Sequence, residues 1–312
     1  WMALYCLTLL ELSLTLAAED PSYEDVAIKF LEHFTLIATS LDEQGLWDEQ
    51  DGFYYDVLRQ NDGTRIPLRA RSMVGLLPLC AVAVLPTSLR ERLPDFSRRM
   101  DWILANRPAV RAVIEHSAAP GENDSYLLSI VSPDRLRRIL SRMLDEEEFL
   151  SPHGIRSLSR AHLAHPLGFR LGDTTARLDY EPAESTTALF GGNSNWRGPI
   201  WWPVNHVLLE ALRRYSLHLG DGYLVECPTG SGQKRTLAEV VAEVERRLIS
   251  LFELTPDGRR PFLGQTPLLL RPGWRDQLQF HEYFHGDTGA GLGASHQTGW
   301  TALVADLILR TD

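Results

Sequence analysis

The sequence is poor in cysteine and carries no excess of positive charge. Its three cysteines, Cys6, Cys80 and Cys227, are too few and too far apart for a disulfide framework or a zinc ribbon, and they fit a reducing compartment. The formal net charge is -10 at pH 7. Because phosphate binding requires a basic surface, this charge argues against nucleic acid as a partner. We therefore expect a cytoplasmic protein that does not bind nucleic acid.

No run of apolar residues is long enough to cross a membrane. The most apolar stretch, residues 1–20, has no basic region at its start and contains Glu11, which argues against a signal peptide. Its apolar part of about fifteen residues is too short for a bilayer. We expect a buried helix here and no membrane partner. The chain also opens on Trp1 without a capping residue, as if it began inside a helix.

Apolar residues recur at helical spacing wherever a period can be read. The spacing predicts a helical hairpin at the start of the chain and an inner helix, apolar nearly all round, with a kink at Pro78. The predicted helices cover residues 1–19, 22–41, 71–85, 89–107, 132–149, 199–219, 236–252 and 298–310. Short strands are predicted at residues 53–59 and 125–131. The sequence is therefore predicted to be all-α, with short strands in its loops.

Four long connections, rich in aromatic and polar residues, separate these helices. Loops of this length are uncommon in a compact domain unless they carry function. No linker or repeat divides the chain, so we expect a single domain over residues 1–312 with the loops at one end. Sequential hairpins suggest a toroid of inner and outer helices, but a closed ring of six pairs needs twelve helices. Either another fold is present or part of the ring is missing.

One of these connections, ESTTALFGGNSNWRGPIWWPVN at residues 184–205, is dense in aromatic and planar polar groups. Aromatic faces beside such groups suit a sugar ring, whose C–H faces stack while its hydroxyls form hydrogen bonds. We expect Asn195, Trp196, Arg197 and Trp201 to bind a carbohydrate. The alternative is that the tryptophans plug the end of a helical barrel and that Arg197 is buried in an ion pair.

A second aromatic segment, GLWDEQDGFYYDVLR at residues 45–59, carries the carboxylates Asp48, Asp51 and Asp56. Asp51 and the glycine after it predict a turn before a short strand. The carboxylates are either site residues or solvated turn residues. Their spacing does not include the later Glu of a calcium loop, so no metal is expected here.

Residues 281–285 match the pattern His-Glu-x-x-His of zinc peptidases. In that class two imidazoles on one helix face bind the metal, and the Glu polarises a bound water. The match is incomplete, because the third ligand of the extended motif is missing from its expected position. Glycines at positions 286, 289, 291 and 293 also end any helix just after His285. A zinc peptidase using His281, Glu282 and His285 stays open as an alternative.

Glu282 stands among Phe280, Tyr283 and Phe284, just before the glycine-rich run. In such a setting a carboxylate can face a cavity and activate water. Glycoside hydrolysis needs a base of this kind together with a second carboxyl group as acid. The glycines would let the backbone approach a ligand closely beside Glu282.

Six motifs, in order along the chain, resemble glycoside hydrolase family 63. They are GLWDEQDGFYYDVLR, EFLSPHGIRSLSR, DYEPAES, GGNSNWRGPIWWPVN, VECPTGSG and FHEYFHGDTGAGLGASHQTGW. The resemblance implies an (α/α)6 toroid of six helical hairpins, an inverting mechanism, a carbohydrate substrate and no cofactor or metal. It also implies that Glu282 is the general base and that the zinc-peptidase match is a coincidence. We expect Asp56, Gln297 and Trp300, which stand in these motifs, to contact the substrate.

The resemblance places the family's general acid just ahead of the helix that begins here at Trp1. We therefore expect an incomplete toroid that lacks its first helices and its acid. The leading hypothesis is an inverting glycosidase, similar to an α-glucosidase, that acts on an oligosaccharide or a small α-glycoside. The alternatives are a carbohydrate-binding or catalytically inactive module that keeps the aromatic loops, and a zinc peptidase.

Overall fold

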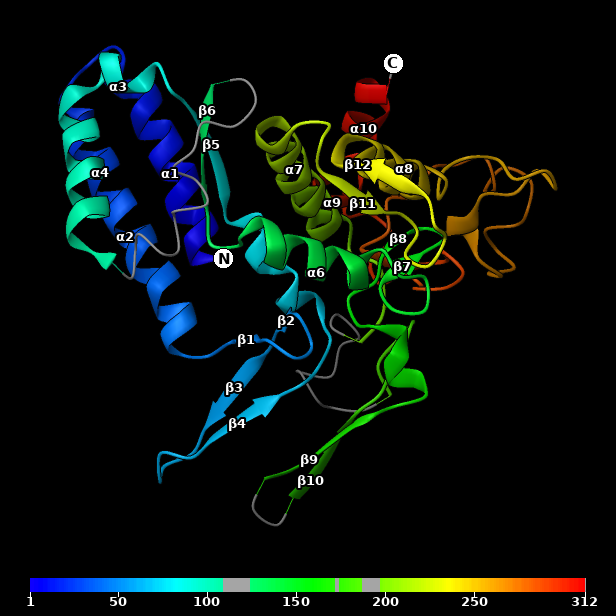
Figure 1. Ribbon diagram of the computed structural model, residues 1–312. Helices are drawn as coiled ribbons and strands as arrows, with labels where there is room; N and C mark the ends of the chain where they lie inside the picture. Colours follow the sequence, from blue (N-terminus) through cyan, green and yellow to red (C-terminus); the bar gives the residue numbers. More distant parts are fainter. Residues whose placement is uncertain (109–123, 172–173, 187–196, 312) are drawn as a thin grey trace. The chain divides into compact units, whose positions relative to one another are not determined.

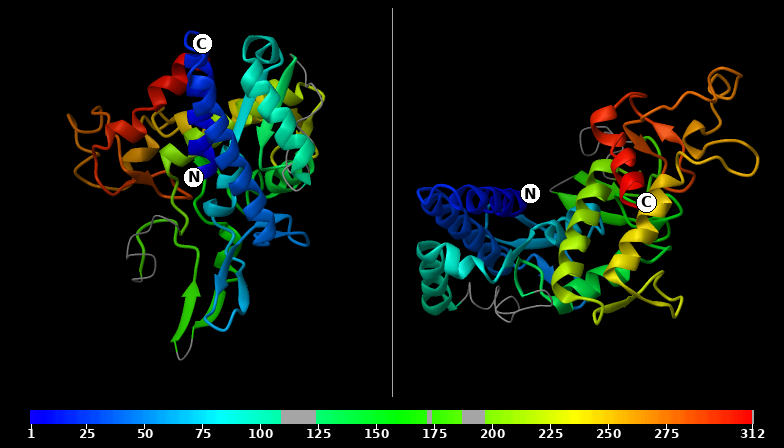
Figure 2. Two further views of the ribbon diagram at one scale, coloured as in Figure 1. Left: turned by 90° about the vertical axis from the view of Figure 1, so that its left-hand side faces the viewer. Right: turned by 90° about the horizontal axis from the view of Figure 1, so that it is seen from above.

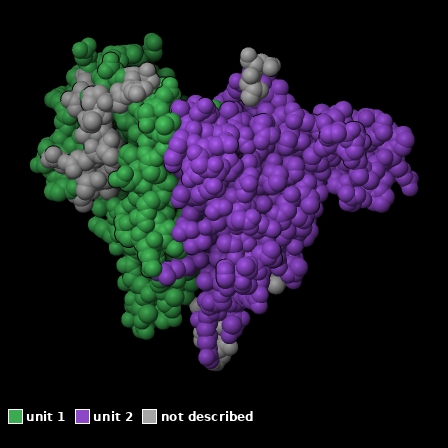
Figure 3. All heavy atoms as spheres, turned by 45° about the vertical axis from the view of Figure 1, so that its right-hand side comes forward, with its two compact units in different colours: residues 1–68, 74–139, 210–224 green, residues 69–73, 140–209, 225–312 purple. Residues whose placement is uncertain are grey.

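The computed structural model describes residues 1–108, 124–171, 174–186 and 197–311 of a chain that divides into two compact units. The first unit comprises residues 1–68, 74–139 and 210–224, and the second comprises residues 69–73, 140–209 and 225–312 (Figure 3). Each unit has its own apolar core, with Phe34 fully buried in the first and Trp202 in the second. The single domain expected from the sequence stays a prediction.

The first unit opens with the predicted helical hairpin, α1 (Met2–Ala17) and α2 (Tyr23–Glu43). The two helices pack side by side, and α4 (Pro94–Asn106) packs against α2 (Figures 1 and 2). Leu7, Leu10 and Leu14 of α1 are buried, as their helical spacing predicts. The helix predicted at residues 89–107 is divided into the single turn α3 (Leu89–Arg92) and α4, since Pro94 starts a new helix.

The prediction of an inner helix at residues 71–85 is wrong. This stretch forms two short 3-10 turns, η1 (Met73–Gly75) and η2 (Leu77–Cys80), and then the strand β5 (Val82–Pro86). β5 pairs antiparallel with β6 (Ser125–Ser129), which lies inside the strand predicted at residues 125–131. A run that is apolar on all sides does not distinguish a buried helix from a buried strand, and the β-branched residues of β5 favour the strand.

The remaining elements of the first unit are short strands and the start of a helix. β1 (Trp47–Asp48) pairs with β2 (Phe53–Tyr54), and β3 (Asp56–Arg59) forms a hairpin with β4 (Arg65–Leu68), so the predicted strand at 53–59 is divided in two. α6 (Pro133–Met143) begins as predicted, because the Ser132 hydroxyl accepts a hydrogen bond from the Arg135 N–H at 3.3 Å.

The second unit combines helices with pairs of short strands. The pairs are β7 (Leu150–Ser151) with β8 (Gly154–Ile155), β9 (Leu167–Leu171) with β10 (Thr174–Leu178), β11 (Leu224–Glu226) with β12 (Lys234–Thr236), and β13 (Tyr283–Phe284) with β14 (Gly291–Leu292). Single 3-10 turns stand at η4 (Arg160–Leu163) and η6 (Pro261–Leu263). The predicted helices appear as α7 (Trp202–Leu219), α8 (Leu237–Ile249), α9 (Thr298–Thr301) and α10 (Val304–Thr311), and α10 packs against α8. The second half of α7 belongs to the first unit.

The described part of the chain is helix-rich and has only short strands, which join in pairs. The structure therefore confirms the prediction of a helix-rich fold with short strands in its loops. The (α/α)6 ring stays a prediction. None of the described helices combines the length and the apolar composition needed to cross a bilayer.

Helix α8 is fixed at both ends by polar contacts. At its start, Thr236 and Glu239 form a capping box, in which each side chain accepts a hydrogen bond from the backbone N–H of the other residue. Near its end, the buried Arg247 guanidinium contacts Glu243 at 2.8 Å and donates to the Ser151 carbonyl of β7 at 3.0 Å. Arg247 therefore ties α8 to β7.

The Glu243 carboxylate pairs with Arg247 in this contact between α8 and β7, and its side chain is 12% exposed. Burial raises the pKa of this carboxyl group, but hydrogen bonds from Arg246 and Arg247 outweigh burial and lower the pKa to about 2. Glu243 is therefore ionised at neutral pH, and together with Glu146 it neutralises the buried Arg247 guanidinium.

Replacing Glu243 should destabilise the second unit in a pH-dependent way. Glu243→Gln should lower the free energy of unfolding near neutral pH by about 1–3 kcal/mol, because the buried Arg247 guanidinium loses one of its two carboxylate partners and keeps only Glu146. The pKa is lower in the folded protein than the value of about 4.3 in an unfolded chain, so the stabilisation is complete above that pH and is lost as the pH falls towards 2. Thermal unfolding from about pH 7 to about pH 3 should therefore show a difference that shrinks with acid.

Glu147→Gln is the matched control. Glu147 also pairs with an arginine, Arg160, but its side chain is 82% exposed, and exposed pairs contribute little to stability. Equal destabilisation by the two substitutions would contradict the anchoring role of Glu243.

Candidate functional site

Glu282 lies directly before β13 and is fixed by the residue opposite it. Its backbone N–H donates to the Ala294 carbonyl at 2.8 Å, and its carboxylate Oε2 accepts a hydrogen bond from the Ala294 N–H at 3.2 Å. The side chain is half-buried. A single residue of the returning chain therefore orients both the main chain and the carboxylate of Glu282.

Gly293 allows this close approach. Its φ of +66° lies in the left-handed region, and a Cβ atom there would stand 2.8 Å from the Glu282 Oε2 and 2.7 Å from the Tyr283 ring. Any other residue would be strained and would push the carboxylate aside. The glycine-rich run thus lets the backbone lie close to the Glu282 carboxylate. The sequence analysis had predicted that these glycines allow the backbone to lie close to a ligand.

Three aromatic rings form a cluster beside Glu282, which we call the aromatic cluster: Trp201, Tyr283 and Trp300. The rings of Trp201 and Tyr283 stack with their centroids 5.0 Å apart, and the Trp300 ring lies 5.6 Å from that of Trp201. Trp201 and Tyr283 are buried, whereas Trp300 is 38% exposed. Trp300 therefore presents the accessible surface of the cluster.

Gln297 connects the aromatic cluster to the segment before β13, which carries Glu282. Its N–H donates to the Phe280 carbonyl at 2.7 Å, and its own carbonyl accepts from the Trp300 N–H at 3.0 Å at the start of α9. The structure thus brings four of the predicted site residues into one region of the second unit: Trp201, Glu282, Gln297 and Trp300. Tyr283 is a member that the sequence analysis did not select, although its position next to Glu282 was a signal for it.

Arg197 lies inside the protein. It is fully buried, and its guanidinium contacts the Glu181 carboxylate at 2.9 Å. Burial raises the pKa of Glu181, but hydrogen bonds from Thr186 and the charge of Arg197 lower it below its ordinary value. This is the buried ion pair that the sequence analysis held as an alternative, so Arg197 orders the loop around Glu181, and its direct contact with a sugar stays a prediction.

The other predicted site residues lie elsewhere. Asn195 and Trp196 are outside the described residues. Asp56 is in the first unit, where it is exposed on β3 opposite Leu68. Its role as a substrate contact stays a prediction.

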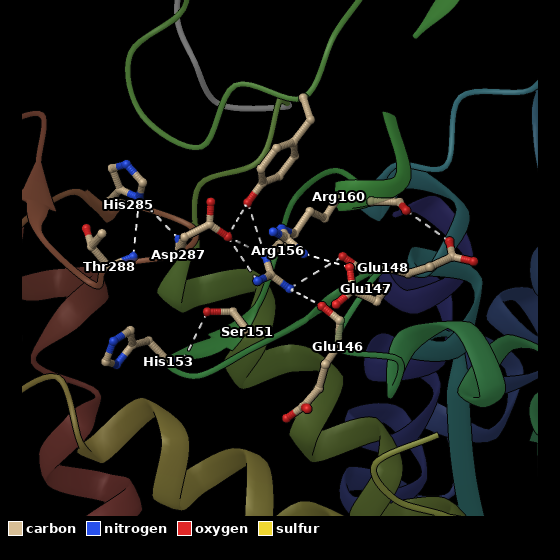
Figure 4. Close-up of polar contacts among 12 residues, drawn as sticks. Glu146, Glu147, Glu148, Ser151, His153, Arg156, Arg160, His285, Asp287 and Thr288 are labelled. Carbon is tan, nitrogen blue, oxygen red and sulfur yellow. Dashed lines mark hydrogen bonds and ion pairs between the residues drawn. The ribbon is translucent and has the colours of Figure 1, made fainter. Parts of the chain in front are cut away.

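A buried polar network fastens the turn that follows β13 (Figure 4). The Asp287 carboxylate accepts hydrogen bonds from the Arg156 guanidinium at 3.0 Å and from the Tyr180 hydroxyl at 2.9 Å. Burial raises the pKa of Tyr180, which keeps the phenol protonated as a donor. The Gly286 N–H donates to the Pro182 carbonyl at 2.8 Å. These contacts hold the end of β13 against residues 180–182.

The sequence analysis did not select Arg156, Tyr180 or Asp287 as members of one network. They lie far apart in the chain, and only their meeting in space reveals their connection. Asp287 follows a glycine directly, but that pattern on its own indicates no more than a turn.

The His-Glu-x-x-His segment is extended, so its two imidazoles do not share a helix face. The His285 Nδ1 accepts hydrogen bonds from the N–H groups of Asp287 and Thr288. His281 is buried against Gly291, and burial lowers its pKa, so its ring is neutral. Within the described residues, no three His, Cys, Asp or Glu side chains meet in a way that could hold a metal ion. The geometry on which the zinc-peptidase alternative depends is thus missing from this segment.

Comparison with known proteins gives several matches. Residues 125–301 match the mannosylglycerate hydrolase MGH1-like glycoside hydrolase domain. An uncharacterised protein of Saccharomyces cerevisiae is 45% identical over 99% of this chain and 30% of its own length. Mannosyl-oligosaccharide glucosidase of the same yeast is 25% identical over 56% of this chain and 15% of that protein. The crystal structure of a glycoside hydrolase family 63 mannosylglycerate hydrolase from Thermus thermophilus, in complex with glucose, aligns with 97% of this chain and 45% of that chain at 14% identity and a TM-score of 0.40.

The chain spans less than a third of the length of either yeast relative. The matched domain covers more than half of the chain and includes Glu282 and the aromatic cluster. It confirms the resemblance inferred from the sequence motifs. The chain therefore belongs to the mannosylglycerate hydrolase MGH1-like glycoside hydrolase domain family, within glycoside hydrolase family 63.

Proposed function

We propose that this chain carries the general base and part of the sugar-binding surface of an inverting glycoside hydrolase. The substrate is an α-linked glucoside, in an oligosaccharide or a small α-glycoside. Family membership supports the reaction class. The name of one relative, a mannosyl-oligosaccharide glucosidase, supports the sugar.

The observation that carries the proposal is the way in which the Glu282 carboxylate is held. Among the described residues, the Ala294 N–H is the one hydrogen-bond donor on this carboxylate, and it contacts Oε2. Oε1 therefore stays available for a water molecule. A base of this kind accepts a proton from water as the oxygen attacks the anomeric carbon from the side opposite the leaving group.

The aromatic cluster supplies the second part of the proposal. Trp300, with 38% of its surface exposed, offers a ring face on which a sugar can stack, and Trp201 and Tyr283 support it from behind. Arg197 acts as a positioning residue through Glu181. An inverting enzyme also needs a carboxylic acid roughly 6.5–9.5 Å from the base, and the proposal for this chain concerns the base.

The fold and the location belong to the same proposal. The α1 and α2 hairpin is the kind of unit from which an (α/α)6 toroid is built. Cys6, Cys80 and Cys227 are free and buried, which supports a reducing compartment such as the cytoplasm.

Removing the base should abolish turnover but not binding. Glu282→Gln in the full-length protein should lower kcat by about 100-fold or more, because the amide cannot accept the proton. Release of glucose from α-glucosides measures turnover, and calorimetry with glucose measures binding. Glu253→Gln, which changes an exposed carboxylate of the same unit, should leave both unchanged.

Two results would overturn this assignment. If a chelator abolished activity and zinc restored it, the zinc-peptidase interpretation of His281, Glu282 and His285 would replace it. If the wild-type protein bound sugars but released none, the carbohydrate-binding module would be the better description.

The stereochemistry of the product tests the inverting mechanism independently of any substitution. Attack by water from the side opposite the leaving group converts an α-glucoside into β-glucose. Proton NMR in the first minutes of the reaction should therefore show the β-anomer before mutarotation. Initial release of α-glucose would contradict an inverting mechanism and would require a covalent intermediate.

Removing the exposed ring of the aromatic cluster should weaken sugar binding. Trp300→Ala should cost about 0.5–1.5 kcal/mol of binding free energy, which raises the Kd for glucose by about 2- to 12-fold. Melting temperature should change little, since the ring is 38% exposed. Trp274→Ala removes a ring that is 46% exposed and should leave the Kd unchanged. Normal binding by Trp300→Ala would instead support a purely structural role for the cluster.

A further inference from the structure

The second unit contains a pocket of about 390 Å³ that the proposed reaction does not use. It opens between residues 255–265, which follow α8, and the turn that joins β13 to β14. Its polar lining includes His153, Thr255, Asp257, Arg259, Arg260 and Thr288. His153 and Thr288 are labelled in Figure 4. No aromatic ring other than the His153 imidazole lines it, so a sugar face has little to stack on, and its chemistry differs from that of the aromatic cluster.

Two arginines of this pocket form no ion pair with a described carboxylate, although the charge of Arg259 contributes to the lowered pKa of Asp257. Arg259 donates to the Gly264 carbonyl at 3.1 Å and Arg260 donates to the Phe252 carbonyl. Among the described residues, no Asp or Glu oxygen lies within 4 Å of either guanidinium, and the buried Arg260 Nε has no hydrogen-bond partner. Both side chains are half-buried, and a buried donor such as the Arg260 Nε normally has an acceptor, because leaving it without one costs free energy. An oxyanion in the pocket would supply the missing partner, and the planar guanidinium suits it.

His153 adds an acceptor to these donors. The Ser250 hydroxyl donates to the Arg247 carbonyl at 2.6 Å, so it receives a hydrogen bond from the His153 Nδ1–H at 3.3 Å. Burial and the charges of Arg247 and Arg156 lower the pKa of His153, so its ring is neutral and Nε2 carries a lone pair. Asp257, which accepts a hydrogen bond from the Thr255 hydroxyl, is a second acceptor on the rim. A ligand that satisfies the lining therefore brings hydroxyl donors as well as negative charge.

We infer that this pocket is a binding site for a small hydroxylated oxyanion, a phosphate or carboxylate group carried on a short polyol. Arg259 and Arg260 bind the oxyanion, and His153 Nε2 and the Asp257 carboxylate accept hydrogen bonds from the hydroxyls. Thr288 and Ala290 place one wall of the pocket on the β13–β14 turn, whereas Glu282 precedes β13 and does not line the pocket. The site is therefore distinct from the proposed general base, and it does not depend on the glycosidase assignment.

Calorimetric titration of the full-length protein tests the inference with three matched probes. Glycerol 3-phosphate carries a phosphate, gluconate carries a carboxylate, and glycerol carries no charge. One or both anions should bind, and glycerol should not, since the arginines recognise charge. Which anion binds decides between the phosphate and the carboxylate. Affinity should fall as salt is added, because the interaction is ionic.

Substitutions locate the binding. Arg259→Gln, which removes one charge, and Arg260→Lys, which keeps the charge but removes the planar fork, should each raise the Kd of the bound anion about tenfold or more. Arg271→Gln, which changes an exposed arginine of the same unit, should leave it unchanged. Glu282→Gln should also leave it unchanged, which separates this site from the proposed active site. Thermal unfolding checks that each variant is folded.

Three results would overturn the inference. The first is that neither anion binds at millimolar concentration. The second is that glycerol binds as tightly as the anions, which would make the pocket a neutral polyol site. The third is that both arginine variants stay folded and bind with unchanged Kd, which would place the anion elsewhere on the protein.

Discussion

The organisation of the second unit depends on the burial of one short strand, β13, in the aromatic core. Phe284 is fully buried, and its ring lies 6.2 Å from that of Trp202 and 6.1 Å from that of Phe252. Its N–H and carbonyl both form hydrogen bonds with Ile200, at 3.0 and 2.8 Å. A strand this short has too few ladder hydrogen bonds to be stable alone. Core packing therefore fixes it, and with it the position of Glu282 two residues earlier.

Polar contacts around β13 add to the core packing that holds this strand in place. Arg156 is 4% exposed, and a charge at that depth is tolerated because Asp287, the Tyr180 hydroxyl and nearby carbonyls receive its hydrogen bonds. The same residues hold the turn after β13. The hairpin is thus fixed at one end by Asp287 and at the other by the contact of Ala294 with Glu282. A carboxylate on a rigid hairpin can hold a water in one orientation, which proton transfer requires.

Two glycines of the β13–β14 hairpin are required for different physical reasons. Gly293 has a positive φ and leaves room for the Glu282 carboxylate, whereas Gly291 leaves room for the His281 imidazole, which would lie 2.1 Å from a Cβ atom. The turn that precedes them also forms a wall of the arginine-lined pocket, through Thr288 and Ala290. One short stretch of chain therefore serves a carboxylate, a buried ring and a second cavity, and this explains why it is so rich in glycine.

Local signals in the sequence determined a large part of the helical structure and indicated the family. The α1 and α2 hairpin, the Ser132 cap of α6 and the helix α8 follow from spacing and capping, which act within a few residues. Six motifs in order along the chain, among them the one around Glu282, indicated the family, and the family match confirmed it. The same kind of signal failed at residues 71–85, because only pairing with β6 decides whether an apolar run is a strand.

Tertiary structure decided the rest. The sequence around Arg197 predicted a contact with a ligand and left a buried ion pair as the alternative. The burial of Arg197 against Glu181 depends on segments that meet only in the folded chain. His281 and His285 match a helical metal motif, and the pairing of β13 with β14 makes the segment extended instead. The network of Arg156, Tyr180 and Asp287 and the pocket around Arg259 and Arg260 join residues from distant parts of the chain. Such features cannot be found from local propensity, because long-range packing decides which side chains meet. The same packing decides which polar groups are removed from water and therefore need a partner.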